Sequence, residues 1–285
     1  MGSFSILNNI SGINAQNQLS QNNVNLSRTL LRLSSGKRIN SGADDAAGLQ
    51  IADSLRANTA ALNQAVRNAN DGVGVSQIAD GALQEVNNLL TRGVSLAEEA
   101  ATETVDSVGR TSLNNEFTQI QAEVARIASQ SNFNGYSIFG ANGVNGSLSI
   151  YVGDITGASS ISVSIGTISA ANGQVTDIGG QNLATVDLTS MDSAATSLGT
   201  IKNALTSVSS MRAGIGSGIN RLQSAVSVLQ TQSQNTQAAE SSIRDANVAT
   251  EVANLTKYQI LSQSGIAALA QANSSSQSVL SLLRG

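Results

Sequence analysis

Two heptad repeats, one toward each end of the chain, constrain the fold more than any other feature of the sequence. Each is a series of mostly apolar residues spaced seven positions apart, and such spacing predicts helices that pack against one another along a single stripe. A helix of about 60 residues would be about 90 Å long, which suits a bundle or a filament and not a single globule. The first series is Leu55, Leu62, Ala69, Ser76, Leu83, Leu90 and Ala97, and the second is Ile201, Val208, Ile215, Leu222 and Leu229.

The composition agrees with long, closely packed helices. No proline is present to interrupt a helix, and only 2% of the residues are aromatic. Small aliphatic side chains must therefore fill the interior, and these allow helix axes to approach closely. A further helix is predicted where apolar residues step by four and three, at Leu113, Phe117, Ile120, Val124 and Ile127.

The first long helix is predicted to start near Asp44, because Ser41 and Asp44 have the spacing of a capping box. Its interior contains Gly72, Gly74 and Gly81, each of which costs about 1 kcal/mol relative to alanine. Either these glycines are simply tolerated, or they permit close approach between layers or subunits. The sequence leaves both interpretations open.

The middle of the chain, residues 136–190, is rich in Gly, Ser, Thr and Ala and predicts strands. Residues 148–152 and 161–165 alternate between apolar and polar side chains, and the two runs flank a turn that contains Gly and Asp. This pattern predicts a β-hairpin. We therefore predict a mainly α fold: a long antiparallel helical or coiled-coil bundle formed by both chain ends, with a small β-hairpin-containing insert.

Several functions are excluded by composition. The chain has no cysteine and no histidine, so Cys/His zinc sites and histidine-based catalysis are ruled out. A net charge of −4 without a basic stripe argues against nucleic-acid binding, and no run of about 18 apolar residues predicts membrane insertion. The carboxylate pairs Asp44–Asp45 and Glu98–Glu99 are interpreted as helix-terminal and solvated charges. We expect no catalytic, metal or cofactor site, and no enzyme.

The chain ends carry apolar residues at helical spacing for which a monomer offers no obvious partner. Such a stripe is typical of an assembly surface. The predicted self-assembly residues are Ile6, Ile10, Ile13, Leu30, Leu33, Val252, Leu255, Ile260, Leu269, Leu280 and Leu283.

Two long motifs at opposite ends resemble a known family. Residues Leu33–Arg56, LSSGKRINSGADDAAGLQIADSLR, resemble the N-terminal signature of bacterial flagellins, and residues Ile243–Asn273 resemble their C-terminal signature. The resemblance covers residues 1–140 and 195–285. Ser276 stands where the family often has a proline, so we expect the last helix to run more continuously here.

The resemblance implies a structural subunit that is exported through the flagellar type III apparatus and polymerises outside the cell into the bacterial flagellar filament. Implied partners are other copies of the chain, an export chaperone, the filament cap and the hook–filament junction proteins. A junction protein, which shares the helical ends, is the alternative. The implied parts are an N-terminal inner-core helix and loop (1–42), two outer-tube helical segments (43–135 and 196–240), a short β-rich insert (136–195) and a C-terminal inner-core helix (241–285).

Arg92, Leu96 and Glu116 match family positions that contact the animal flagellin-sensing Toll-like receptor. Arg92 and Leu96 are four residues apart and are expected to share a helix face. An ordinary subunit contact is the alternative for all three. The Ser- and Thr-rich middle could carry O-linked glycans or could be a plain polar surface.

Overall fold

The computed structural model describes residues 9–139, 146–154, 157, 159–171 and 174–284, with side chains described as far as residue 275. These residues form two compact units. Unit 1 comprises Met1–Ala57 and Asn235–Gly285, and unit 2 comprises Asn58–Gln234. The five-part division drawn from the sequence refers to layers of an assembled filament and stays a prediction.

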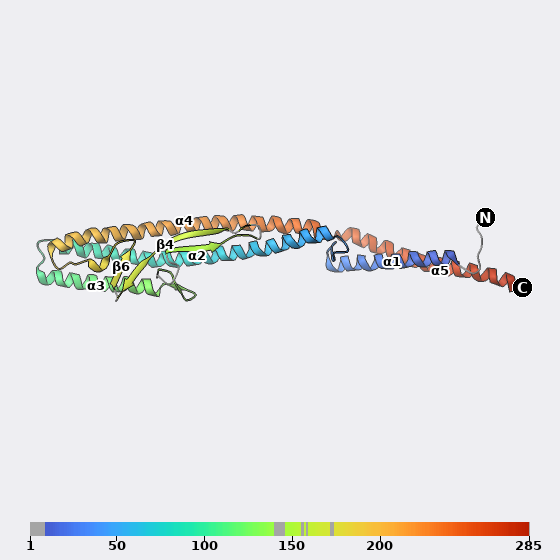
Figure 1. Ribbon diagram of the computed structural model, residues 1–285, viewed down its shortest axis with the longest axis horizontal. Helices are drawn as coiled ribbons and strands as arrows, with labels where there is room; N and C mark the ends of the chain where they lie inside the picture. Colours follow the sequence, from blue (N-terminus) through green and yellow to red (C-terminus); the bar gives the residue numbers. More distant parts are fainter. Residues whose placement is uncertain (1–8, 140–145, 155–156, 158, 172–173, 285) are drawn as a thin grey trace. The chain divides into compact units, whose positions relative to one another are not determined.

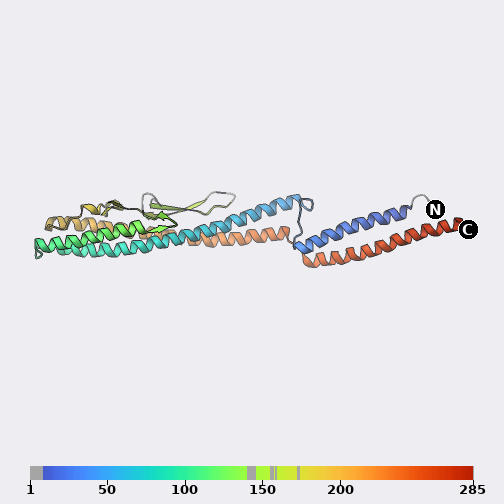
Figure 2. The ribbon, with the colours of Figure 1, turned by 90° about the horizontal axis from the view of Figure 1, so that it is seen from below.

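Unit 1 is built around the antiparallel helices α1 (Ile10–Ser35) and α5 (Val248–Arg284), which lie side by side in both ribbon views (Figures 1 and 2). The Asn9 side chain caps α1 by accepting a hydrogen bond from the backbone N–H of Gly12, at 2.9 Å. The helix ends at Gly36, whose φ of 68° lies in the left-handed region that glycine tolerates best. Helix α5 continues without interruption through Ser276, as expected from the missing proline.

Unit 2 is organised by three helices, and it confirms the heptad prediction. The helices are α2 (Ala46–Ala100), whose first turns belong to unit 1, α3 (Ser107–Gln130) and α4 (Met191–Arg244), whose last turns also belong to unit 1. Apart from Leu55, which belongs to unit 1, every residue of the two heptad series is buried. Phe117 and Val124 of α3 pack into the same hydrophobic core. The predicted mainly α bundle is therefore confirmed.

Arg212 lies four residues after Val208 of the second heptad series, where the other repeats have Leu205, Ile219 and Val226. The structure explains this charged residue. Its guanidinium makes two hydrogen bonds to the carboxylate of Asp80 on α2, at 2.8 and 3.3 Å. The hydrogen bond to Asp80 raises the pKa of Arg212 above its usual value. A bidentate pair has strict geometry, so it fixes the register of α2 against α4.

The insert contains antiparallel strand pairs. The hairpin of β3 (Gly146–Tyr151) and β4 (Ser160–Gly166) confirms the prediction, with Leu148 opposite Val163 and Ile150 opposite Ile161. A second pair, β5 (Ile168–Ala171) with β6 (Gln174–Ile178), was not predicted. A short pair, β1 (Asn132–Phe133) with β2 (Tyr136–Ser137), follows α3, and a 3-10 helix, η1 (Leu183–Thr185), precedes α4.

Glycines in the helices make room for the β3–β4 hairpin. A Cβ atom on Gly72 of α2 would lie 2.5 Å from Ile150, and one on Gly218 of α4 would lie 2.4 Å from Val163. Gly72 is thus explained by close packing inside the subunit. Gly74 and Gly81, in contrast, face open space, with nothing within 4 Å of an added Cβ.

Replacing Gly218 by alanine is expected to destabilise the protein, and the neighbouring Gly216 offers a matched control. The added methyl of Gly218→Ala would press on Val163, whose branched side chain is stiff, so we expect a loss of about 1–2 kcal/mol in the free energy of unfolding. Gly216 has open space around it, so Gly216→Ala should stabilise α4 by about 0.5–1 kcal/mol. Chemical denaturation measures both values, and equal stabilities of the two variants would contradict the packing argument.

Candidate assembly surface and the joint beside it

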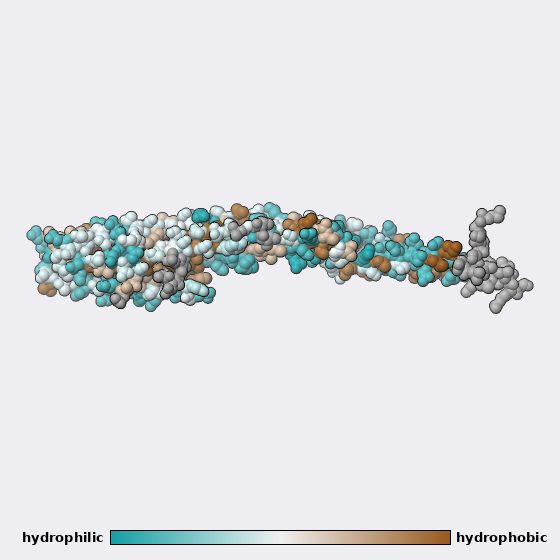
Figure 3. Space-filling view, in the orientation of Figure 1, coloured by the Kyte–Doolittle hydropathy of each residue, from teal (hydrophilic) through white to brown (hydrophobic). Residues whose placement is uncertain are grey.

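The terminal helices expose their apolar residues instead of burying them. Within the described side chains, neither α1 nor α5 contributes a hydrophobic residue to the buried core, and the only buried hydrophobic residues of unit 1 are Ile39 and Ala52. In Figure 3, apolar surface is visible along unit 1 between hydrophilic residues. We call the apolar residues of α1 and α5 that solvent reaches the assembly surface. Its most exposed members are Ile10, Ile13, Val24, Leu30, Leu31, Val248, Val252, Ile260, Leu261 and Ile266.

The structure places most of the predicted assembly residues on this surface or at its edge. Ile10, Ile13, Leu30, Val252 and Ile260 are exposed. Half-buried positions are occupied by Leu33, Leu255 and Leu269. Ile6 and the side chains of Leu280 and Leu283 lie outside the described part of the chain. Five exposed residues, Val24, Leu31, Val248, Leu261 and Ile266, were missed although they belong to the same helices and a full count of apolar positions would have found them.

Half-buried apolar side chains, an ion pair and hydrogen bonds hold α1 against α5. The Asn9 side chain donates a 3.2 Å hydrogen bond to the carbonyl of Ala272, and the Ser262 hydroxyl donates a 3.3 Å bond to the side-chain oxygen of Asn23. Fully burying one Leu, Ile or Val side chain contributes roughly 1.5–3 kcal/mol, and the described Leu, Ile and Val side chains of this pair are at most half-buried, as at Leu33 and Leu255. A second surface that covered the exposed parts would therefore add to the stability of the pair.

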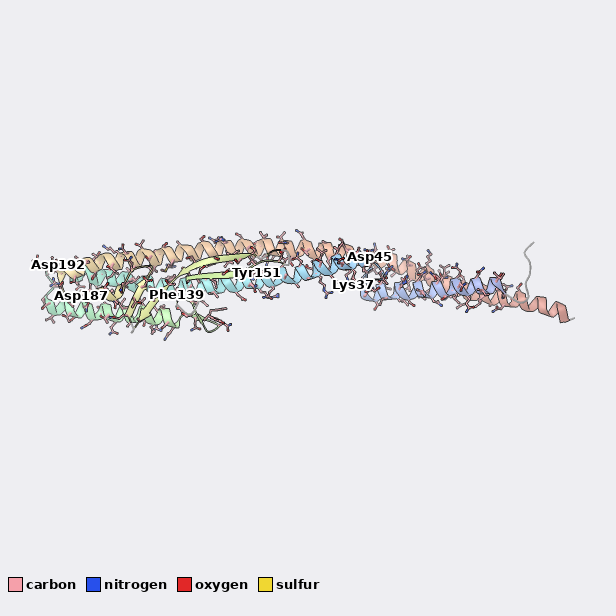
Figure 4. All side chains as sticks on the ribbon, in the orientation of Figure 1. Lys37, Asp45, Phe139, Tyr151, Asp187 and Asp192 are labelled. Atoms are coloured by element: carbon pink, nitrogen blue, oxygen red, sulfur yellow. The ribbon has the colours of Figure 1, made fainter. Side chains whose placement is uncertain are left out.

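Two short segments of unit 1 separate its helices: residues 36–45 lie between α1 and α2, and residues 245–247 lie between α4 and α5. We call these two segments together the joint. The backbone N–H of Arg38 donates to the carbonyl of Arg244 at 2.7 Å, and the N–H of Ala246 donates to the carbonyl of Gly36 at 2.9 Å. Lys37, labelled in Figure 4, forms an antiparallel bridge with Asp245. Backbone hydrogen bonds thereby hold together two segments that are far apart in the sequence.

Charged side chains surround the joint and pair across it. Arg32 at the end of α1 lies 3.5 Å from Asp44 of the joint and 3.8 Å from Glu251 at the start of α5. Glu251 is only 7% exposed, and a buried carboxylate needs a compensating charge. Arg244 pairs with Asp53 at 3.1 Å. These pairs make the end of α1 and the start of α5 depend on each other.

The start of α2 differs in one detail from the capping prediction. Asp45, not Ser41, caps the helix, because its carboxylate accepts a 2.9 Å hydrogen bond from the N–H of Gly48. Ser41 and Asp44 instead close the turn before the helix, with the Ser41 N–H and hydroxyl each 3.1 Å from Asp44. Gly48 permits this cap, since a Cβ there would lie 2.4 Å from the Asp45 carboxylate. Figure 4 labels Asp45 at this position.

Acid is expected to loosen the joint through Asp44. Although burial raises the pKa of Asp44, hydrogen bonds from Ser41 and Asn40 and the charge of Arg32 outweigh it, and the pKa lies below the usual range for an aspartate. A carboxyl whose pKa is lowered by folding stabilises the fold above its unfolded pKa, and that stability disappears as the pH falls through the folded pKa. We expect amide exchange in residues 36–45 to accelerate, beyond its intrinsic pH dependence, as the pH falls below about 4.

The variant Asp44→Asn provides the control for this acid effect. It should show faster exchange than the parent chain at neutral pH and should lose the acid-dependent step, because the amide does not titrate in this range. An unchanged acid response in this variant would assign the effect to another group.

The three predicted receptor positions do not form one exposed patch. Arg92 and Glu116 are exposed and form an ion pair between α2 and α3, with a nitrogen–oxygen distance of 2.7 Å. Leu96 is 0% exposed and packs in the core of unit 2. Four helical residues turn the chain by 40° more than a full circle, and here that rotation takes Leu96 from the solvent side to the core. Arg92 and Glu116 are therefore accessible in the subunit and Leu96 is not, and the receptor assignment of the three residues stays a prediction.

Among the residues that the structure describes, no group of three or more acidic side chains has the arrangement of a metal site. None of the helices in the part of the chain that the structure covers is long and apolar enough to cross a membrane.

The terminal helices α1 and α5 leave their apolar residues uncovered, and unit 2 has a core of its own. These two features define a structural subunit that associates with other protein surfaces. Known proteins make this assignment specific. The bacterial flagellin N-terminal helical region matches residues 6–143, and the C-terminal helical region matches residues 198–283. The chain belongs to the bacterial flagellin family.

Similarity to curated proteins extends over almost the whole chain. It is 39% identical to flagellin FlaB1 of Treponema pallidum, and the alignment covers 98% of this chain and 99% of that protein. Identity to the flagellin of Bacillus subtilis is 34%, with 98% and 99% covered. A solved structure, the flagellin of Bacillus cereus, is 26% identical with a TM-score of 0.49, and the match covers 61% of this chain and 94% of that one.

Proposed function

We propose that this chain is the structural subunit that polymerises into a bacterial flagellar filament outside the cell. One observation carries the proposal beyond family membership: α1 and α5 expose a continuous series of apolar residues while unit 2 keeps a separate buried core. Copies of the same chain are the partner that would cover this surface, because a contact repeated between identical subunits without closure produces a helical polymer.

Electron microscopy of the purified protein tests the proposal directly. The protein is imaged before heating, after heat depolymerisation, and after regrowth from added seeds. We expect tubular filaments before heating and after seeding, and monomers in between. Absence of any tubular polymer would overturn the proposal. The hook–filament junction alternative has no support among the relatives, and it predicts short caps instead of growing filaments.

Finer aspects of the function are also proposed. Unit 1 would supply the inner layer of the filament and unit 2 the outer layer, with α1 and α5 as the inner helices. An export chaperone, the filament cap and the junction proteins would bind the same chain at other stages. Support for these partners comes from family membership and from the uncovered ends, which need protection before assembly.

We further propose that Arg92 and Glu116 contribute to recognition by the animal flagellin-sensing Toll-like receptor. Arg92→Ala removes the exposed cation of the pair, and we expect receptor activation by the monomer to fall about tenfold or more. Arg126, which pairs with Glu123 on the exposed side of α3, provides a matched control, since Arg126→Ala should leave activation unchanged. Equal activation by the parent chain and Arg92→Ala would remove the assignment.

A further inference from the structure

Met211 of α4 occupies an unusual position among the sulfur-containing side chains. The chain has three methionines and no cysteine, so thioethers are its only sulfur groups. Met191 lies at the first position of α4 and is 44% exposed. Met211 is partly buried and packs against the main core of unit 2.

The thioether of Met211 lies directly against two glycines that border the hairpins. A Cβ on Gly166, at the end of β4, would lie 2.6 Å from the Met211 sulfur, and one on Gly179, just after β6, would lie 3.2 Å from its methyl carbon. Both glycines have positive φ, 80° and 57°. The ends of two hairpins therefore meet on one flexible apolar side chain.

The next turns of α4 continue this contact. A Cβ on Gly214 would lie 3.3 Å from the carbonyl of Ser164, and Gly218 lies under Val163. Residues 211, 214 and 218 share one face of the helix, because they are spaced by three and four. Met211 is thus the end of the surface on which β4 packs, and it is the only member of that face with a side chain that oxidants attack.

We propose that Met211 is an oxidation site whose modification by hydroperoxides releases the hairpins from α4. The sulfur lone pair attacks one peroxide oxygen, the S–O bond forms as the O–O bond breaks, and the leaving oxygen takes the proton and departs as water or an alcohol. The sulfur is oxidised to the sulfoxide and the peroxide is reduced. No other reactant is needed.

The sulfoxide does not fit the space that the thioether occupies. The new oxygen is polar and needs hydrogen-bond donors, whereas the sulfur lies where a Cβ on Gly166 would be only 2.6 Å away and the side chain packs against the apolar core. Either the oxygen stays without a partner or the β4–β5 connection moves outward to admit water. Met191 is 44% exposed, so the oxygen added there can face water.

The test treats the full-length monomer with hydrogen peroxide and compares Met191→Leu with Met211→Leu, since both variants retain Met1. Peptide mass spectrometry locates the added oxygen, and a thermal melt reports the stability of unit 2. Oxidised Met191→Leu should melt about 3–8 °C below its untreated form, while Met211→Leu should keep its melting temperature after the same treatment. The loss in Met191→Leu should follow the fraction of sulfoxide at Met211 and not that at Met1.

Two outcomes overturn the proposal. In the first, Met191 of the parent chain is fully converted to the sulfoxide while Met211 stays unoxidised, which would show that peroxide does not reach Met211. The other is a fully oxidised Met211 in Met191→Leu with an unchanged melting temperature. Because the decisive measurement uses Met191→Leu, which alters an exposed side chain, it stands even if Met211→Leu folds poorly. None of these measurements depends on polymerisation.

Discussion

A chain that lacks residues 1–35 and 248–285 is expected to remain a folded monomer and to lose polymerisation completely. The deletion removes α1 and α5, whose described side chains contribute no hydrophobic residue to the buried core. Both hydrophobic clusters lie in unit 2 and stay intact. We therefore expect the truncated chain to retain a cooperative thermal transition and a monomeric mass by light scattering, while seeded growth gives no filament in the electron microscope.

The full-length chain, depolymerised by heat and seeded in parallel, controls for the activity of the seeds. Filaments grown from the truncated chain would contradict an assembly role for α1 and α5. Loss of the cooperative thermal transition would instead show that unit 2 does not fold without α1 and α5. This outcome is measured separately from filament growth.

A single charge on the assembly surface is expected to have the next largest effect. Ile260 of α5 is 57% exposed in the subunit, so Ile260→Asp should leave the melting temperature of the monomer within about 1 °C of the parent. In a polymer that covers this side chain, the unpaired carboxylate would cost several kcal/mol. We expect the critical concentration for assembly, measured by sedimentation of seeded reactions, to rise by about 100-fold or more.

Ile260→Leu is the matched control, since it keeps the apolar character and the volume of the side chain. Its critical concentration should stay within about threefold of the parent value. If Ile260→Asp assembles as readily as Ile260→Leu, this part of α5 faces solvent in the polymer and the assembly surface must be redrawn.

The helices and the main hairpin could be predicted because their signals are local and repeated. Heptad positions such as Leu83 and Leu222 recur at fixed spacing, and within unit 2 one face of α2 and one face of α4 are buried. Alternation at Leu148 and Ile150 likewise identified β3. The β5–β6 pair was missed because its strands are short and its polar residues interrupt the alternation, as at Ser169 and Asp177.

The pairing across the joint could not be predicted, because no local pattern relates its two parts. Lys37 and Asp245 are ordinary polar residues near helix ends, and their pairing brings together parts of the chain that a local pattern does not relate. The cap of α2 was placed four residues early, at Ser41, because the spacing of Ser41 and Asp44 fits a capping box. Only the geometry at Gly48 selects Asp45. The burial of Leu96 depends on which side of α2 faces the core, and the spacing of four residues between Arg92 and Leu96 does not give this.

The joint also affects the order in which the parts of the chain fold. Its hydrogen bonds and those between α1 and α5 join opposite ends of the chain: Arg38 and Ile243 are 205 residues apart, and Asn9 and Ala272 are 263 apart. Contacts of such high sequence separation form late, because the loop between them must close first. A chain that emerges from either end can build parts of unit 2 while unit 1 still lacks its other half. We therefore expect the assembly surface to be completed last, when both ends of the polypeptide are present, and an unfinished chain not to polymerise.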